Sequence, residues 1–410
     1  MNTTPVANRL HISIFGRRNA GKSTLINALT NQKIAVVSDI AGTTTDPVQK
    51  TMEILPIGPV VIIDTAGYDD TGDLGNLRVE KTYDVLRKTD LAIVVISAED
   101  GITDDDRDFI KGVKRKEIPT IVVINKSDKS DISQDQLNIY KEELGVPVCK
   151  ISAEHNKGID ELKDLIVKNA KYEEMQTTIV GDLIKPGDMV VLVTPIDLSA
   201  PKGRLILPQQ QTIRDILDND AIAVVTKENG LKDALSNLSI KPSIVITDSQ
   251  VFSKVAAETP EDIRLTSFSI LYARYKGELT QLLMGVKKIK ELKAGSKVLI
   301  VEGCTHKCEA DDIGRVKIPG WLRKFCGEGI EFEWANGTFY PKEIDKYDLI
   351  IHCGGCMLNK KEMGYRLNTA KEKNVAITNY GMLIAYVHGI LPRALQPFPS
   401  VRGMLDSLAP

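Results

Sequence analysis

Short apolar runs alternate with amphipathic stretches between Leu10 and about Ala170. Four runs rich in β-branched residues are predicted strands: Ile12–Phe15, Val60–Ile63, Leu91–Ile96 and Thr120–Ile124. Each run is apolar at consecutive positions, which indicates burial on both faces, and helical patterns separate the runs. Parallel sheets covered by helices on both faces have this pattern. The sequence therefore predicts an α/β fold whose N-terminal domain is a doubly wound, mostly parallel sheet.

The rest of the chain continues the α/β pattern in two smaller units. After the amphipathic segment Ile159–Val167, a polar stretch is typical of an exposed linker. A second amphipathic segment, Ile270–Leu292, divides six further predicted strands into two groups of three. These strands are Met189–Val193, Ala221–Val225, Ser243–Ile246, Lys297–Val301, Asp348–Ile351 and Val375–Thr378. We therefore expect three domains, over residues 1–172, 178–264 and 266–410.

Composition and charge restrict the function. The chain has 410 residues, which is long for a single core, and carries 53 basic against 55 acidic residues, for a net charge of −2. Without a basic surplus, no nucleic-acid partner is expected. The N-terminus lacks the regions of a signal peptide, and no apolar run approaches the roughly 18 residues of a membrane span. We expect a cytoplasmic protein with no membrane association.

A phosphate-binding loop directly follows the first predicted strand. The segment from Gly16 to Ser23 reads G-x-x-x-x-G-K-S and opens a predicted helix, the context that this motif requires. Its glycines let backbone N–H groups surround a phosphate at a helix N-terminus, where the helix dipole favours an anion. We expect Lys22 to contact the β- and γ-phosphates and Ser23 to bind Mg²⁺. The alternative, a plain glycine-rich turn, rarely matches all the fixed positions by chance.

Two further motifs stand at the carboxyl ends of predicted strands, where doubly wound folds bind ligands. In Asp64-Thr-Ala-Gly67, the aspartate is expected to hold Mg²⁺ through water and the glycine amide to sense the γ-phosphate. Asn125-Lys126-Ser-Asp128 resembles the guanine-specificity motif of the translation-factor-like GTPases, and Ser152-Ala153 resembles its supporting loop. A carboxylate at Asp128 accepts both guanine N–H donors and mismatches adenine, so the predicted nucleotide is GTP.

The segment Ser38–Asp46 resembles the switch I of the Era and tRNA-modification GTPases. By that resemblance Thr44 closes on Mg²⁺, and Asn19 and Thr43 help to hold K⁺, which stimulates turnover. Tyr68 stands where Ras-like enzymes carry the glutamine that orients the attacking water, so slow hydrolysis is expected. Lys22, Thr44 and Gly67 are the predicted catalytic residues. The predicted GTP- and GDP-binding residues are Gly16, Asn19, Ala20, Gly21, Lys22, Ser23, Thr24, Thr43, Thr44, Asp64, Gly67, Asn125, Lys126, Asp128, Ser152 and Ala153, of which Ser23, Thr44 and Asp64 bind Mg²⁺.

Cysteine and histidine residues follow two strands predicted in the last third of the chain. Cys304 and His306 follow one strand, and His352, Cys353 and Cys356 follow the other. If these strands are parallel neighbours, the side chains converge on one point. Spacing leaves three alternatives open: an iron–sulfur cluster, a structural zinc with three cysteines and one histidine, or uncoordinated thiols. The remaining cysteines are Cys149, expected in a strand, Cys308, a spare ligand, and Cys326, which has no obvious partner.

Over nearly its whole length the chain resembles the FeFe-hydrogenase H-cluster maturation GTPases. The signature of that family is C-x-H, a gap and H-C-x-x-C; here Cys304-Thr-His306 and His352-Cys353-Gly-Gly-Cys356 are separated by 45 residues. The segments Ala200–Pro208, Thr266–Gly277 and Asp311–Pro319 are also similar to stretches typical of the family. The resemblance implies a P-loop G domain, a dimerisation domain and an iron–sulfur domain, in this order.

The resemblance also implies the ligands and the partners. Cys304, Cys353 and Cys356 would bind a 4Fe-4S cluster, with His306 or His352 as candidate fourth ligand. The protein would be a GTPase and a scaffold for the di-iron subcluster, as a homodimer or a higher oligomer. It would receive a di-iron precursor from two radical-SAM maturases and transfer it to apo FeFe-hydrogenase.

Two other functions stay open at this point. One is an Era-like GTPase acting in ribosome assembly or tRNA modification, with a zinc-stabilised C-terminal module. The other is a redox sensor in which the cysteines gate the G domain. Outside these motifs, the acidic run Asp104–Asp106 predicts a solvated loop.

Overall fold

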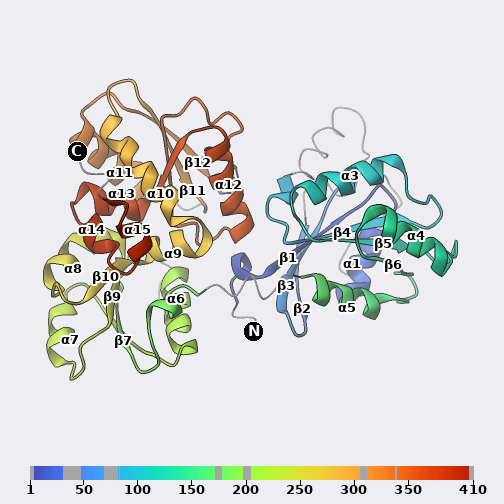
Figure 1. The fold of residues 1–410 in the computed structure, drawn as a ribbon, viewed down its shortest axis with the longest axis horizontal. Coiled ribbons are helices and arrows are strands. Elements are labelled where there is room, and N and C mark those ends of the chain that lie inside the picture. Colours follow the sequence, from blue (N-terminus) through green and yellow to red (C-terminus); the bar gives the residue numbers. More distant parts are fainter. Residues whose placement is uncertain are drawn as a thin grey trace. The chain divides into compact units, whose positions relative to one another are not determined.

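The structure is a computed structural model of the chain. It describes residues 4–30, 48–68, 82, 84–170, 178–196, 205–304, 312–337 and 339–405. The chain divides into two compact units, Met1–Gln176 and Thr177–Pro410, which are described separately (Figure 1). Among the helices of the described residues, none is long and apolar enough to cross a membrane. The bounds of the three domains expected from the sequence stay a prediction.

The first unit is built on one six-stranded sheet with the strand order β2-β3-β1-β4-β5-β6. The strands are β1 (Leu10–Phe15), β2 (Val48–Ile54), β3 (Gly58–Asp64), β4 (Leu91–Ser97), β5 (Thr120–Asn125) and β6 (Val148–Lys150). Neighbouring strands are parallel, except that β2 is antiparallel to β3. The α-helices among the described residues of this unit include α1 (Lys22–Thr30), α3 (Asp104–Arg115), α4 (Gln134–Leu144) and α5 (Ile159–Asn169). The predicted doubly wound, mostly parallel sheet is confirmed.

Apolar side chains pack on both faces of this sheet. Along β4, Leu91, Ile93 and Val95 belong to a cluster that includes α1 and α5. Ala92 and Val94 belong to a second cluster, which includes α3 and α4. Because successive strand side chains point to opposite faces, a strand buried on both faces is apolar at every position. The continuous apolar runs of the sequence therefore have their cause in this double layer.

One strand of the first unit is missing from the sequence prediction, and another was indicated only by its cysteine. β2 is an edge strand that is polar and largely exposed, so its composition does not indicate a buried strand. β6 has only three residues, of which the sequence analysis expected Cys149 to lie in a strand. Both lie at the edges of the sheet, where burial is incomplete and the periodic signal is weak.

The second unit contains two four-stranded sheets, and all the paired strands in both are parallel. In the order β10-β9-β7-β8, the first consists of β7 (Met189–Val193), β8 (Ile222–Thr226), β9 (Ile244–Thr247) and β10 (Arg264–Ser267). In the order β12-β11-β13-β14, the second consists of β11 (Lys297–Glu302), β12 (Glu331–Asn336), β13 (Leu349–His352) and β14 (Ala376–Asn379). The predicted further α/β units are confirmed, with β10 and β12 as strands that the sequence did not reveal.

One continuous apolar cluster extends over both sheets of the second unit. The helices around it are α6 (Leu207–Asp218), α7 (Leu231–Asn237), α8 (Phe252–Glu258), α9 (Phe268–Lys276), α10 (Leu279–Val286), α11 (Ile318–Cys326), α12 (Lys360–Glu372), α13 (Tyr380–Val387), α14 (Leu391–Ala394) and α15 (Pro399–Arg402). Helix α9 contacts both β10 and β14, and Figure 1 shows it where the two sheets meet. The α9 helix therefore joins the two halves of this unit.

The long amphipathic segment Ile270–Leu292 is two α-helices rather than one. Gly277 ends α9, and a Cβ at this position would lie 2.8 Å from Leu367 Cδ1. In α10, a Cβ at Gly285 would lie 1.9 Å from the carbonyl oxygen of Ile377, so this helix packs directly on β14. The break at Gly277 lets the two helices follow different surfaces, which the helical periodicity did not reveal.

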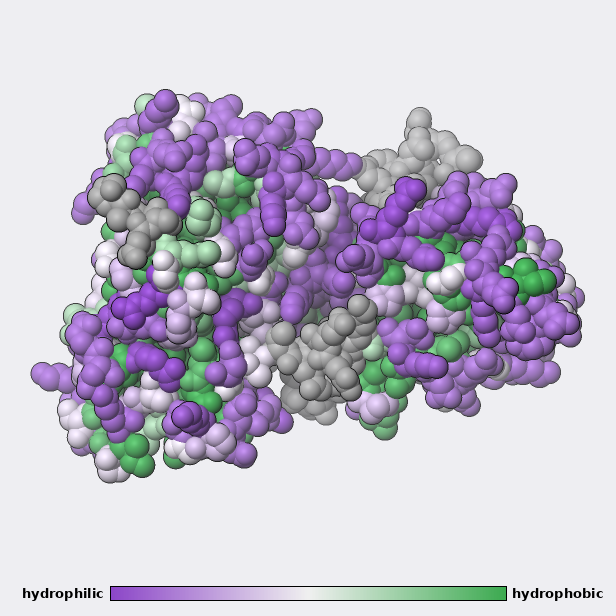
Figure 2. Space-filling model, viewed as in Figure 1, coloured by the Kyte–Doolittle hydropathy of each residue, from purple (hydrophilic) through white to green (hydrophobic). Residues whose placement is uncertain are grey.

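Figure 2 shows that the visible face of each unit is mainly hydrophilic, with hydrophobic side chains in small groups.

Candidate functional site

The phosphate-binding loop lies between β1 and α1, as the motif predicts. Gly16 has a φ of +153°, and a Cβ there would lie 2.3 Å from the carbonyl oxygen of Val95. The φ of Gly21 is +90°, and a Cβ there would lie 2.3 Å from Asn125 Nδ2. Both glycines are therefore required by close approaches as well as by backbone conformation. Lys22 Nζ donates to the carbonyl oxygens of Gly16 (2.7 Å) and Arg17 (2.8 Å).

The residues predicted to surround the loop are only partly described. Asn19 adopts a left-handed conformation with a φ of +58°, Ala20 is buried in the loop, and Thr24 lies in the first turn of α1. Thr43 and Thr44, the predicted K⁺ and Mg²⁺ ligands of switch I, lie outside the described residues. Their roles stay predictions.

Asp64 and Ser23, two of the predicted magnesium ligands, are in contact. Ser23 Oγ donates to Asp64 Oδ2 at 3.1 Å, although the two residues come from β3 and α1. Asp64 Oδ1 is buried and has no hydrogen-bond partner among the described residues. Burial raises the pKa of this carboxyl, opposed by the nearby Lys22 ammonium. An unsatisfied buried carboxylate oxygen beside a hydroxyl fits Mg²⁺, which prefers oxygen ligands.

The residues predicted to recognise guanine come together at the ends of β5 and β6. Ser152 Oγ donates to Asp128 Oδ1 at 2.5 Å, and this hydrogen bond lowers the pKa of the Asp128 carboxyl. Asn125 Nδ2 donates to the Ala20 carbonyl at 3.0 Å, and Asn125 Oδ1 accepts from the Ala153 N–H at 3.1 Å. The asparagine therefore ties the specificity loop to the phosphate-binding loop. Lys126 has a φ of +62°, and its Nζ donates to Glu99 Oε2 at 3.2 Å.

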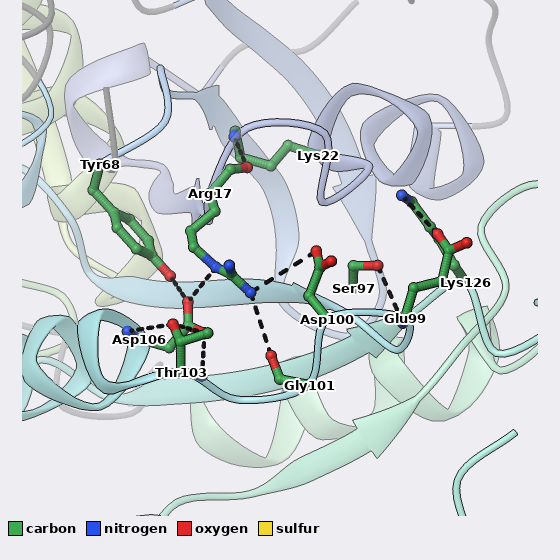
Figure 3. Close-up of polar contacts among 10 residues, drawn as sticks. All are labelled: Arg17, Lys22, Tyr68, Ser97, Glu99, Asp100, Gly101, Thr103, Asp106 and Lys126. Carbon is green, nitrogen blue, oxygen red and sulfur yellow. Dashed lines mark hydrogen bonds and ion pairs between the residues drawn. The ribbon is translucent and has the colours of Figure 1, made fainter. Parts of the chain in front are cut away.

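A buried carboxylate connects the phosphate-binding loop to the residue after Gly67. Asp106 Oδ1 accepts from the hydroxyl of Tyr68 (2.5 Å) and forms an ion pair with Arg17 Nε (3.3 Å). Asp106 Oδ2 accepts from both N–H and Oγ1 of Thr103, each at 2.8 Å. Figure 3 shows Tyr68 and Arg17 pointing toward this carboxylate. The ring of Tyr68 stacks on Phe109, with a centroid separation of 4.3 Å.

The predicted solvated loop at Asp104–Asp106 is wrong, because these residues form the first turn of α3. Asp104 and Asp105 are exposed there, while Asp106 has no exposed surface. Thr103 and Asp106 form a capping box, and a T-x-x-D pattern at 103–106 is the sequence signal that could have revealed it. Sequence reasoning also missed Arg17, since the loop motif does not specify its side chain.

The cysteine-bearing strands β11 and β13 are parallel neighbours, as expected. Cys304 follows β11 and Cys353 directly follows β13. Cys353 Sγ accepts hydrogen bonds from the N–H groups of Gly303 (3.1 Å) and Gly355 (3.4 Å). Backbone N–H donors to a cysteine sulfur favour a thiolate ligand and tune the potential of iron–sulfur clusters. Burial nevertheless raises the pKa of Cys353 to about 11 and of Cys304 to about 12.

Both ring nitrogens of His352 are occupied. Nε2 lies 3.0 Å from Arg366 Nη1, and Nδ1 lies 2.8 Å from the Cys353 carbonyl oxygen. Because a guanidinium only donates, Nε2 accepts and Nδ1 carries the proton. Burial, assisted by the Arg366 charge, lowers the pKa of His352 to about 3. Arg366 also donates to Glu362 Oε1 at 2.8 Å and to the Gly337 carbonyl at 2.9 Å.

The prediction that His352 is a fourth ligand therefore finds no support in this geometry. His306 and Cys308 lie outside the described residues. Cys326 Sγ donates a hydrogen bond to the Ile289 carbonyl oxygen at 3.1 Å. Cys149 is a strand residue of β6, as expected, and burial raises its pKa to about 12.

Within the described ranges, no three His, Cys, Asp or Glu side chains are close enough together to hold one metal ion. A mononuclear zinc needs such convergence, whereas each cysteine of a 4Fe-4S cluster binds a different iron. Burial is the main cause of the raised pKa of Cys304, and the Cys353 and Cys356 thiols and the buried Glu302 carboxyl add to it. Cys304, Cys353 and Cys356 follow two neighbouring parallel strands, and the N–H donors on Cys353 suit a sulfur that binds one iron of a polynuclear cluster.

Profiles of known families match the chain in three consecutive segments. The profile described as a 50S ribosome-binding GTPase matches residues 11–126. The profile of the hydrogen maturase F dimerization domain matches residues 179–277, and that of the hydrogen maturase F tetramerization domain matches residues 280–397.

Curated relatives match mainly the N-terminal part of the chain. The tRNA modification GTPase MnmE of Heliobacterium modesticaldum is 36% identical over 154 residues, which are 37% of this chain and 32% of that protein. GTPase Der of Bartonella tribocorum is 32% identical over 252 residues, 58% of this chain and 48% of that protein. The chain thus spans less than half the length of either relative. The solved structure of Aquifex aeolicus Era is 23% identical to this chain, with a TM-score of 0.37. The match covers 56% of this chain and 98% of that chain. A structural similarity of this size is no guide to function.

Proposed function

Because the chain belongs to the hydrogen maturase F family, we propose that it is a GTPase and scaffold for hydrogenase maturation. The observation that carries this proposal is the coexistence of two separate sites in one chain. The first unit brings Asp128, Ser152 and Asn125 to the loop from Gly16 to Ser23, and the second places Cys304, Cys353 and Cys356 after two neighbouring parallel strands.

In the nucleotide site, the loop from Gly16 to Ser23 binds the phosphates of GTP and GDP, and Lys22 neutralises the β- and γ-phosphates. Ser23 and Asp64 hold Mg²⁺ together with Thr44, and Asp128 recognises guanine. The Ser152 hydroxyl supports this role because it keeps the Asp128 carboxylate ionised and oriented. Gly67 and Thr44 respond to the γ-phosphate, and hydrolysis is slow because Tyr68 replaces a water-orienting glutamine.

Asn19 and Thr43 bind K⁺ and make turnover potassium-dependent. The left-handed backbone of Asn19 turns the phosphate-binding loop at the residue expected to contact the ion, which supports this role. Comparing GTP hydrolysis in potassium and sodium buffers of equal ionic strength tests it. Equal rates in the two buffers would remove potassium from the proposal.

In the second unit, Cys304, Cys353 and Cys356 hold a 4Fe-4S cluster, which supplies an iron with a weaker, exchangeable fourth ligand. His306 is the remaining candidate histidine for that position. The cargo is a di-iron precursor, received from two radical-SAM maturases in the cytoplasm and delivered to apo FeFe-hydrogenase. The N–H donors at Cys353 support the cluster because they stabilise negative charge on sulfur.

The proposed homodimer forms through the edge strand β8. This strand lies in the segment that matches a dimerization domain and is the outer strand of its sheet among the described residues. On this strand, Ile222 and Val225 are each 45% exposed, and the other three residues of β8 are half-buried. Exposed apolar edge strands pair readily with a second strand, so a second copy of this chain is the proposed occupant.

One experiment tests the whole proposal. The protein is purified anaerobically from cells that express the other maturases and is mixed with apo FeFe-hydrogenase, and hydrogen evolution is measured. Activation is the expected result, from brown protein with about four irons per chain. Colourless protein that carries one zinc and activates nothing would leave only the GTPase.

A further inference from the structure

Lys276 is a buried lysine beneath the cysteine loop of the second unit. It is the last residue of α9 and only 3% exposed. Its Nζ donates three hydrogen bonds, to the carbonyl oxygens of Gly355 (3.1 Å), Cys356 (2.9 Å) and Leu358 (2.7 Å). All three acceptors belong to the turn that follows Cys353. This one side chain therefore fixes the backbone that carries two of the three clustered thiols.

Three acceptors require three N–H donors, which only the charged ammonium form of lysine supplies. A buried charge is costly unless a group of opposite charge lies nearby. Burial lowers the pKa of Lys276 to about 8, and the thiols of Cys356 and Cys353 oppose this shift. In the described part of the chain, Lys276 forms no ion pair with a carboxylate. The ring of Tyr272, 5.6 Å from Nζ, adds only a weak attraction. The ammonium group of Lys276 therefore has no carboxylate partner among the described residues. The nearby groups that could become negatively charged are the thiols of Cys353 and Cys356, when they are deprotonated as cluster ligands.

The lysine and the cysteines come from different segments. Lys276 lies in the part that matches a dimerization domain, whereas Cys304, Cys353 and Cys356 lie in the part that matches a tetramerization domain. Gly277 ends α9, and a Cβ at this position would lie 2.8 Å from Leu367 Cδ1 and 3.9 Å from Met363 Cγ of α12. The position of α9 therefore controls where the charge stands relative to the cysteine loop.

We propose that Lys276 is a positioning residue of the iron–sulfur site, which orders the turn from Cys353 to Leu358 and balances the negative charge of the thiolate-bound cluster. This inference rests on the proposed function of the second unit. The proposal gives α9 a role both in retaining the cluster and in setting its reduction potential. A residue that only packs against the cysteine loop would affect retention without shifting the potential. A positive charge close to a cluster favours the reduced, more negative state.

Three substitutions separate the hydrogen bonds from the charge. Lys276→Met removes both, Lys276→Gln keeps two donors without the charge, and Lys276→Arg keeps the charge. Lys293→Met, at an exposed lysine of the same unit, is the matched control. Each full-length protein is reconstituted anaerobically, and iron content, the rate of iron loss to a chelator and the midpoint potential by redox titration are measured, with circular dichroism as the check of folding.

The Met variant is expected to lose iron to the chelator about tenfold faster than wild type. The Gln variant is expected to shift the ratio of reduced to oxidised cluster about tenfold toward the oxidised form at a given potential, which is about 59 mV for one electron. The Arg and Lys293→Met proteins should resemble wild type. Wild-type potential in folded Gln variant overturns the charge role, and wild-type iron retention in folded Met variant overturns the ordering role. If the Met variant does not fold, the Gln variant decides. A wild-type protein that binds no cluster would instead refute the proposed function.

Discussion

The hydroxyl of Tyr68 lies 2.5 Å from Oδ1 of the fully buried Asp106. Tyr68 occupies the position after Gly67 at which a water-orienting glutamine stands in Ras-like enzymes, yet its hydroxyl is directed to α3 (Figure 3). The same carboxylate pairs with Arg17 of the phosphate-binding loop. Tyr68, the residue after Gly67, is thus linked through Asp106 to Arg17 of the predicted phosphate-binding loop.

Tyr68→Phe removes only this hydroxyl. We expect the free energy of unfolding of residues 1–176 to fall by about 1–2 kcal/mol, because Asp106 loses one charge-assisted hydrogen bond but keeps its bonds to Arg17 and Thr103. Turnover of GTP should stay within about threefold of wild type. Denaturant titration and single-turnover hydrolysis measure the two quantities. Unchanged stability with a large loss of turnover would make Tyr68 a catalytic residue instead.

Lys22→Ala should lower GTP hydrolysis by at least about 100-fold, because the β- and γ-phosphates lose their fixed positive charge. Iron content after reconstitution should not change, since the cysteines belong to the other compact unit. Cys353→Ser should have the reverse effect on the two readouts. If either single substitution abolishes both properties in folded protein, the two sites are not independent.

Asp128→Asn should weaken GTP binding by about tenfold or more, because an amide cannot accept from both guanine N–H groups. Binding of xanthosine triphosphate should improve, since the amide NH₂ can donate to the carbonyl that xanthine carries in place of the guanine amino group. Titration with fluorescent nucleotides measures both affinities. Lys129→Ala, at the exposed neighbouring position, is the control and should bind GTP as wild type does. An unchanged preference for guanine would show that another residue sets specificity.

Arg366→Met should destabilise the second unit by about 3–5 kcal/mol, because Glu362 and His352 lose their buried partner. His352→Gln should cost less, about 1–3 kcal/mol, since it leaves one buried donor of Arg366 poorly satisfied. Iron content of folded His352→Gln protein should equal that of wild type, because both ring nitrogens already have partners. Loss of the cluster without loss of stability would restore His352 as a ligand.

Val225→Lys should weaken self-association by at least about tenfold, because a charge would be buried at the β8 edge. Sedimentation velocity over a range of concentrations measures the dimer. Ile139→Lys, at an exposed apolar residue of α4 in the first unit, is the matched control and should leave association unchanged. Equal weakening by both substitutions would point away from β8.

The sequence determined the parts of the molecule in which one physical requirement acts on neighbouring residues. Strands buried on both faces must be apolar throughout, so the central strands β1, β4 and β5 were predictable. The phosphate-binding loop was predictable because its glycines and lysine are fixed by the chemistry of a phosphate. Edge strands such as β2 and β12 escaped prediction, since half-exposed positions place little constraint on composition.

Only the tertiary structure decided how distant residues combine. His352 and Arg366 are 14 positions apart, and their hydrogen bond occupies the Nε2 atom of the imidazole. Lys276 and the turn after Cys353 are about 80 positions apart. Asp106, Arg17 and Tyr68 lie in three separate segments of the chain and interact with one another. Such pairs leave no periodic signal, because burial and charge balance are satisfied across the fold rather than along the chain. The sequence by itself thus determined which chemical groups the protein carries, and the packing of its sheets and helices determined which of those groups act together.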